Sequence, residues 1–189
     1  MSKRLALSLA MLLASGCSRA EYVKDGVATD EGIAAIALPK EQYREMLKRT
    51  FLGTTTGPMT LGVLGLEKGC DVLDEAVEAA VAQNLAQWRA NLIAAYRNNV
   101  PPDQLAEAVQ KSPRRARAML QPHLSSIGDR MKRSSQSLLQ QSGVQVMQAA
   151  SAEAQKVDLA SIDMQARQRE LDETKASGEI CGVRRWQQQ

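Results

Sequence analysis

The sequence predicts an all-α protein: a helical bundle around two long helices, with shorter helices and a glycine-rich loop beside them. Aromatic residues make up only 3% of the 189 residues, whereas 44% are apolar and many of these are alanine. This composition favours helices that pack through small side chains. The chain also contains no sustained alternation of β-branched or aromatic residues with polar ones, which is the pattern of a half-buried strand.

The longest periodic stretch runs from Asp71 to Asn99 and predicts the first long helix. Its apolar residues recur in steps of three or four, the spacing of one helical face: Leu73, Val77, Val81, Leu85, Trp88, Leu92 and Tyr96. The opposite side is polar, so this single face must be buried against other segments. A second long helix is expected from His123 to about Val157, with a bend near Gly128 or Gly143, since glycine weakens a helix by about 1 kcal/mol relative to alanine.

Shorter elements are expected on either side of the long helices. Prolines favour helix starts over residues 41–51 and 114–120, and the Pro101-Pro102 pair ends the first long helix before a short helix at 103–111. A polar helix over 162–175 should lie on the surface. Five glycines between residues 53 and 69 predict an apolar loop that passes closely over the helices. No Gly-Lys-Ser/Thr sequence closes this loop, so a phosphate-binding role is not favoured.

Residues 1–16 have the organisation of a signal peptide. Lys3 and Arg4 form a positive start, and the apolar run from Leu5 to Ala14 is far shorter than the roughly 20 residues that span a bilayer. Small residues then lead directly to Cys17. This arrangement resembles the signal of bacterial lipoproteins, in which a lipobox precedes the cysteine that is lipidated and becomes the new N-terminus. Ala14 departs from that pattern, which usually has leucine there, and ordinary secretory cleavage is the alternative.

The resemblance to lipoproteins implies a location in the cell. Cys17 would carry the acyl chains, palmitate among them, and Ser18 in place of aspartate resembles the type that is sorted to the outer membrane. We therefore expect a protein anchored by lipid on the periplasmic side of the outer membrane. In this division of the chain, residues 17–38 form a tether and residues 39–189 form the helical domain.

A second resemblance covers a shorter part of the chain. The segment from Tyr96 through Leu105 to Ser112-Pro113 resembles a family of small, helical, periplasmic proteins of unknown function. The chain lacks the aromatic pair that this family usually has before Ser-Pro, and it has Arg115 where the family tends to have glycine. This resemblance implies a helical fold and no catalytic residues.

The cysteines predict one disulfide. If Cys17 is lipidated, Cys70 and Cys181 remain as an even pair in an oxidising compartment, where disulfides form and persist. The bond would pin the C-terminal tail to the beginning of the first long helix. Closing a loop of that length would stabilise the fold by roughly 4 to 5 kcal/mol.

No group of residues indicates an enzyme, a metal site or a cofactor. His123 is the only histidine, and a zinc site usually needs several histidine or cysteine ligands at short spacing. No nucleophile motif accompanies it, so we expect an ordinary surface or helix-start histidine. Asp74 and Glu78 are one helical turn apart but fall on the polar side of the apolar stripe, which favours a solvated face over a glycosidase pair.

Charge is distributed unevenly along the sequence. The formal net charge is +3, and removing residues 1–16 leaves 22 basic and 21 acidic side chains. A basic cluster nevertheless stands between residues 111 and 133, and its candidate partner-binding residues are Arg114, Arg115, Arg117, Arg130, Lys132 and Arg133. These cations either face the acidic stretch at 71–78, or lie in water, or dock an acidic protein surface or anionic headgroups.

These observations predict a non-enzymatic, lipid-anchored periplasmic protein that binds a protein partner with an acidic surface and masks or inhibits it. Such a protein would be an immunity-type lipoprotein or an accessory subunit of an envelope machine. The alternatives are a structural lipoprotein that self-associates and, less favoured, a peptidoglycan or lipid hydrolase. The near-neutral mature chain has few aromatic residues for stacking bases, so a nucleic-acid partner is not expected.

Overall fold

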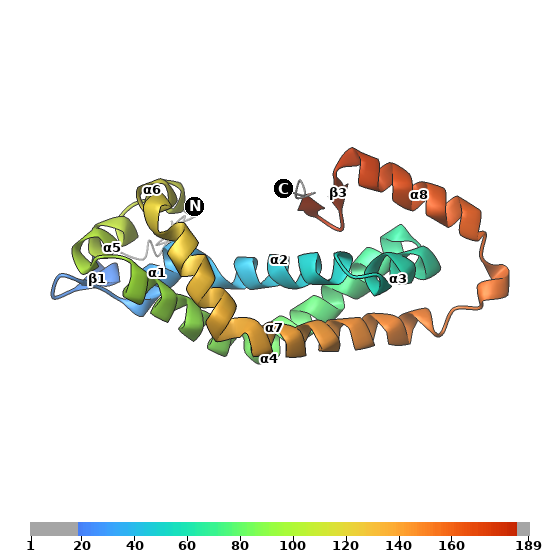
Figure 1. Ribbon diagram of the computed structural model, residues 1–189, viewed down its shortest axis with the longest axis horizontal. Helices are drawn as coiled ribbons and strands as arrows, with labels where there is room; N and C mark the ends of the chain where they lie inside the picture. The colour runs from blue at the N-terminus through green and yellow to red at the C-terminus, as the bar shows by residue number, and fades with distance from the viewer. Residues whose placement is uncertain (1–18, 185–189) are drawn as a thin grey trace, which may run out of the picture.

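A computed structural model describes residues 19–184 and has the all-α fold that the sequence predicts (Figure 1). Its α-helices are α1 (Asp30–Ala37), α2 (Pro39–Leu52), α3 (Thr56–Leu64), α4 (Leu66–Asn99), α5 (Pro102–Val109), α6 (Pro113–Met119), α7 (Leu124–Ala154) and α8 (Met164–Ser177). Short 3-10 turns lie at Arg19–Tyr22 (η1), Gln121–His123 (η2) and Leu159–Ser161 (η3). The two long helices, α4 and α7, pack together at the centre of the molecule.

The two long helices run antiparallel, and regularly spaced polar contacts set their register. Asn84 of α4 donates to Ser142 Oγ of α7 over 3.1 Å, and Asn91 donates to Ser135 Oγ over 3.0 Å. The two asparagines are seven residues apart, and so are the two serines in the opposite direction. Both serines are fully buried. Small side chains at these points allow the two helices to approach closely, and the asparagines satisfy their hydroxyl groups.

The core follows the apolar stripe of α4. Six of the seven predicted stripe residues are buried, and Leu85 is partly buried against them. Residues on either flank of this stripe are buried as well: Ala76, Ala80, Ile93 and Ala95. The reason is that α4 is covered from two sides, by α2 and by α7. Within the described residues, the buried and partly buried apolar side chains extend from Tyr22 to Val183.

The predicted glycine-rich loop is wrong, because residues 56–64 form α3 and α4 begins at Leu66. The glycines instead allow close packing of helices. A Cβ atom on Gly57 would lie 2.2 Å from the carbonyl oxygen of Phe51, and one on Gly69 would lie 2.7 Å from the Leu61 side chain. Gly65, with φ of +82°, makes the turn between α3 and α4. Cys70 consequently lies inside α4 and not before it.

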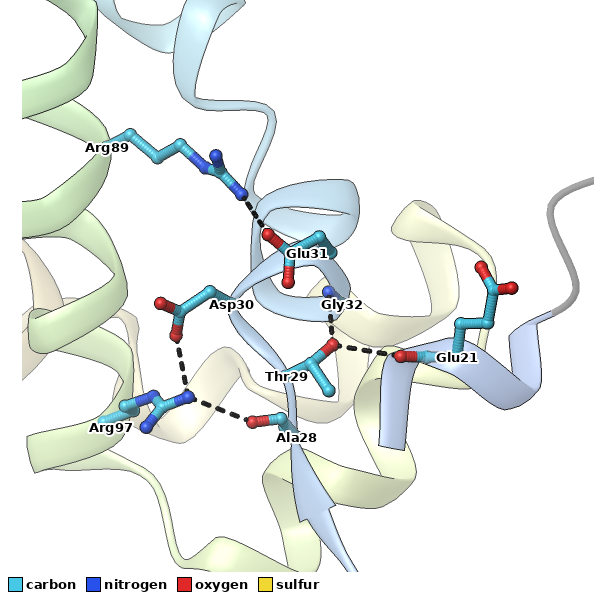
Figure 2. Close-up of polar contacts among 8 residues, drawn as sticks. All are labelled: Glu21, Ala28, Thr29, Asp30, Glu31, Gly32, Arg89 and Arg97. Carbon is cyan, nitrogen blue, oxygen red and sulfur yellow. Dashed lines mark hydrogen bonds and ion pairs between the residues drawn. The ribbon is translucent and has the colours of Figure 1, made fainter. Parts of the chain in front are cut away.

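The tether predicted for residues 17–38 is also wrong from Arg19 onward, because this segment folds onto the body. After η1, strands β1 (Val23–Lys24) and β2 (Val27–Ala28) form a two-residue hairpin that leads into α1. Ile33 is fully buried. Thr29 caps α1 by accepting from Gly32 N over 3.1 Å (Figure 2). The burial of α1 depends on contacts with distant residues of α4 that no local pattern reveals.

Ion pairs attach this N-terminal segment to the end of α4. Arg97 donates to Asp30 Oδ1 over 2.7 Å and to the carbonyl oxygen of Ala28 over 3.2 Å, and Arg89 reaches Glu31 over 3.2 Å (Figure 2). Leu38, with φ of +49°, then turns the chain sharply into α2. The beginning of the described chain is therefore fixed beside the end of α4.

The second long helix agrees closely with the prediction. α7 runs unbroken through Gly128 and Gly143 and curves along its length in Figure 1. Beyond η3, the polar helix α8 packs along α3, and only Leu171 of its described side chains is buried. Strands β3 (Glu179–Ile180) and β4 (Val183–Arg184) form a second hairpin that returns to α2.

Candidate functional site

A disulfide and a buried lysine fasten the C-terminal hairpin to the body. Cys70 of α4 and Cys181 lie with their Cα atoms 5.1 Å apart and their sulfur atoms bonded. Cys181 and Gly182 form the two-residue turn between β3 and β4, and both have positive φ angles. The cysteine pairing expected from the sequence is therefore present in this structure.

Lys48 of α2 is the second fastening point. Its side chain is nearly buried, and its Nζ donates to the carbonyl oxygen of Cys181 over 2.9 Å and forms an ion pair with Asp74. A buried ammonium group requires such partners because its desolvation is costly. The sequence offered no signal for this role, since Lys48 is separated from Cys181 by 133 residues.

Two carboxylates near the beginning of α4 are paired with cations of α2. Glu78 pairs with Lys40 over 3.2 Å and with Arg44 over 3.0 Å, while Asp74 pairs with Lys48 and, over 3.7 Å, with Arg44. These carboxylates are therefore ion-paired side chains on a half-exposed surface. Asp74 and Glu78 have their partners on α2. The interpretation that the basic cluster faces residues 71–78 is therefore wrong.

The basic cluster, defined as Arg114, Arg115, Arg117, Arg130, Lys132 and Arg133, lies on α6 and the first turns of α7. All six side chains are exposed, and within residues 19–184 none of them makes an ion pair. Lys111, just before α6, is by contrast paired with Glu107 over 3.3 Å. The cluster consequently presents free positive charge to the surroundings.

The six cations do not lie on one face of the molecule. The three arginines of α6 all avoid the direction of buried Ala116. On α7, Arg130 and Lys132 are two residues apart, which places them about 200° apart around the helix axis and on opposite flanks of buried Met131. The structure thus brings the cluster to one end of the molecule but divides it into an α6 part and an α7 part.

The whole molecule is electrically polarised along its length. The Asn84–Ser142 contact separates a first half, residues 19–38 and 84–141, from a second half, residues 39–83 and 142–184. The first half has 11 basic and 7 acidic residues, and the second half has 10 basic and 14 acidic residues. The charges are therefore +4 and −4. The positive half contains the beginning of the described chain together with the basic cluster.

A buried polar network crosses the middle of the bundle. Tyr43 Oη and Ser142 Oγ are 2.5 Å apart, and the Tyr43 ring stacks on Trp88 with centroids 4.7 Å apart. Burial raises the pKa of Tyr43, although the hydrogen bond with Ser142 opposes this shift. Burial likewise raises the pKa of Tyr96, against the nearby positive charge of Arg117. Both phenols are therefore neutral structural groups at ordinary pH.

The remaining candidate residues are placed as ordinary structural groups. His123 ends η2 directly before α7, as expected for a helix-start histidine, and its Nε2 lies 2.9 Å from Gln104 Oε1. Over residues 19–184, no three His, Cys, Asp or Glu side chains are grouped as a metal site would require. In the same range, no helix has both the length and the apolarity needed to cross a membrane. Cys17 lies outside the described residues.

A pocket of about 480 Å³ opens between α3, the start of α4 and α8. It is lined by Val63, Leu64, Lys68, Val157, Ser161, Ile162, Asp163, Ala166, Arg167 and Glu170. Its charges are mixed, and Arg167 contacts Glu170 over 3.5 Å. The Arg167 guanidinium also packs on Gly65, where a Cβ would lie 2.2 Å from Nη1. This arginine therefore serves packing, and the lining indicates no particular chemistry.

Comparison with known proteins does not assign this chain to a family. No family model, no curated protein and no solved structure matches this chain.

Proposed function

We propose that this protein is a lipid-anchored, non-enzymatic protein of the periplasmic side of the outer membrane that binds and masks a protein partner. The observation that supports this proposal best is the basic cluster. Its six cations are exposed and unpaired within the described residues, although carboxylates elsewhere in the fold have partners. A patch of unpaired cations attracts acidic surfaces and accelerates their association.

The proposed partner is a protein with an acidic surface, which is either a toxin that arrives in the periplasm or a component of an envelope machine. The α7 part of the basic cluster is the better protein-docking surface, because Arg130, Lys132 and Arg133 project from a long helix that is packed against α4. A helix that is packed against the body holds the backbone of these residues in place, so less backbone freedom is lost on binding.

Two measurements test this proposal. Intact mass spectrometry of the protein from a membrane fraction is expected to show cleavage before Cys17 and acyl chains on that cysteine. The lipidated protein should then recover a specific partner from detergent-solubilised envelopes, and the variant Arg130→Glu/Lys132→Glu/Arg133→Glu should lose it.

The matched control is Lys156→Glu/Arg169→Glu/Arg184→Glu, which reverses three exposed cations in the negative half of the molecule and should retain the partner. Recovery of no partner above background would count against a binding role. An unlipidated mass would remove the proposed anchor.

A further inference from the structure

The anchor and the folded body are separated by almost no chain. Between Cys17 and η1 stands only Ser18, and two residues span at most about 7 Å. Tyr22, at the end of η1, is packed against the core and accepts a backbone hydrogen bond from Thr29 N over 2.9 Å. Thr29 Oγ1 also donates to the carbonyl oxygen of Glu21 over 3.2 Å (Figure 2). The body therefore cannot drift away from an anchored Cys17.

The part of the body next to the anchor is its positive half. η1 packs against α1 and α5, and α6 packs against the same two helices, so α6 lies at the end of the molecule where the described chain begins (Figure 1). α7 starts at this end but leads away from it. At about 1.5 Å per residue, Arg133 lies roughly 14 Å along the helix from Leu124. The α6 part of the cluster is thus the one closer to the anchor.

The carboxylates at this end do not cancel the α6 arginines. Asp30, Glu31 and Glu107 are paired with Arg97, Arg89 and Lys111. Glu21, Asp25, Asp103 and Asp129 make no ion pair within residues 19–184, but the first half keeps its excess of four positive charges when they are counted. α6 itself has three arginines within four positions and no acidic residue.

We infer that Arg114, Arg115 and Arg117 of α6 contact the anionic phospholipid headgroups of the membrane that holds the lipid anchor. The inference rests on the proposed function through the anchor at Cys17. It orients the molecule with its positive half against the bilayer and its negative half in the periplasm. An anionic headgroup layer attracts basic residues within about one Debye length, roughly 8 Å at physiological salt. The short link from Cys17 keeps the end of the molecule that carries α6 beside this layer. The α7 cations remain available to a protein.

The test uses the unacylated mature chain, residues 18–189, which retains every described residue, the hydrophobic core among them and the disulfide. Its partition onto phosphatidylcholine vesicles with and without phosphatidylglycerol is measured by co-flotation at low and at physiological salt. Phosphatidylglycerol should strengthen binding, and salt should weaken it. The variant Arg114→Gln/Arg115→Gln/Arg117→Gln should bind these vesicles roughly a hundredfold more weakly, since each basic residue near such a surface contributes about fivefold.

Two controls remove the same number of charges elsewhere. Lys156→Gln/Arg169→Gln/Arg184→Gln acts in the negative half, and Arg130→Gln/Lys132→Gln/Arg133→Gln acts on α7. Both should lower the partition constant much less than the α6 variant, and circular dichroism should show that all three variants are folded. Equal losses in the three variants would reduce the effect to net charge and overturn the assignment to α6.

Binding that is indifferent to phosphatidylglycerol would also overturn the inference and leave all six cations to a protein partner. These outcomes are separate from those of the proposed function, because vesicle binding of the unacylated chain does not depend on lipidation or on a protein partner.

Discussion

Breaking the bond between Cys70 and Cys181 should cost this fold a large part of its stability. The two cysteines are 111 residues apart. In the chain-entropy model, a cross-link across a loop of this length lowers the conformational entropy of the unfolded chain. At 25 °C this raises the free energy of unfolding by about 5 kcal/mol. A typical domain has a free energy of unfolding of about 5 to 15 kcal/mol, so this loss would leave the fold marginal. The variant Cys70→Ala/Cys181→Ala should also unfold with a steeper dependence on urea, because its unfolded state is less compact.

Urea denaturation of the unacylated mature chain measures this effect, since that chain contains no other cysteine. The oxidised protein, the protein reduced with excess dithiothreitol and the double-alanine variant are compared. The two forms without the bond should agree with each other and lie well below the oxidised protein. If the free energy of unfolding fell by less than about 1 kcal/mol without the bond, the cross-link would not restrict the unfolded chain as the model requires, and the entropic argument would be refuted.

Two further predictions follow from the packing of particular residues. Gly128→Ala should stabilise the protein by about 1 kcal/mol, because Gly128 lies in the second turn of α7 and a Cβ there meets no atom within 4 Å. Gly57→Ala should destabilise it through the clash with Phe51, and equal melting temperatures for the two variants would contradict this. Tyr43→Phe should cost about 1 kcal/mol at neutral pH through loss of the hydrogen bond with Ser142. Because burial raises the pKa of Tyr43 above its usual 10.0, the unfolded tyrosine ionises first and the native protein loses stability as the pH rises above 10. Tyr43→Phe should lose less stability than the unsubstituted protein above pH 10. If urea titrations at alkaline pH showed the same loss in both proteins, Tyr43 would not be its source.

Much of the fold could be predicted because its signals are local. Prolines at positions 39, 102 and 113 occupy the first turns of α2, α5 and α6, where the missing N–H costs nothing. The stripe from Leu73 to Tyr96 was sufficient to identify the buried face of α4. The cysteine pair followed from counting, once Cys17 was set aside. Each of these inferences depends on neighbouring residues or on chemistry that does not require the tertiary fold.

The errors occurred where distant residues decide the conformation. Glycines at 57, 65 and 69 suggested a loop, but two of them allow close helix packing and only Gly65 turns the chain. The first described residues suggested a tether because they include Gly26 and Gly32 and their apolar side chains show no sustained periodicity. They are fixed in place by Arg89 and Arg97, more than 50 residues further along the chain.

The sequence by itself determined the two long helices, the short helices that begin at prolines and the pairing of the cysteines, because helix periodicity, proline positions and thiol chemistry are readable along the chain. Only the tertiary structure decided the partners of the charges. It paired Asp74 and Glu78 of α4 with α2 and enclosed Lys48 beside Cys181. It also left the basic cluster unpaired within the described residues, at the end of the molecule where the described chain begins. The physical reason is that a salt bridge or a free patch depends on distances between residues far apart in sequence, and those distances exist only after the helices have packed.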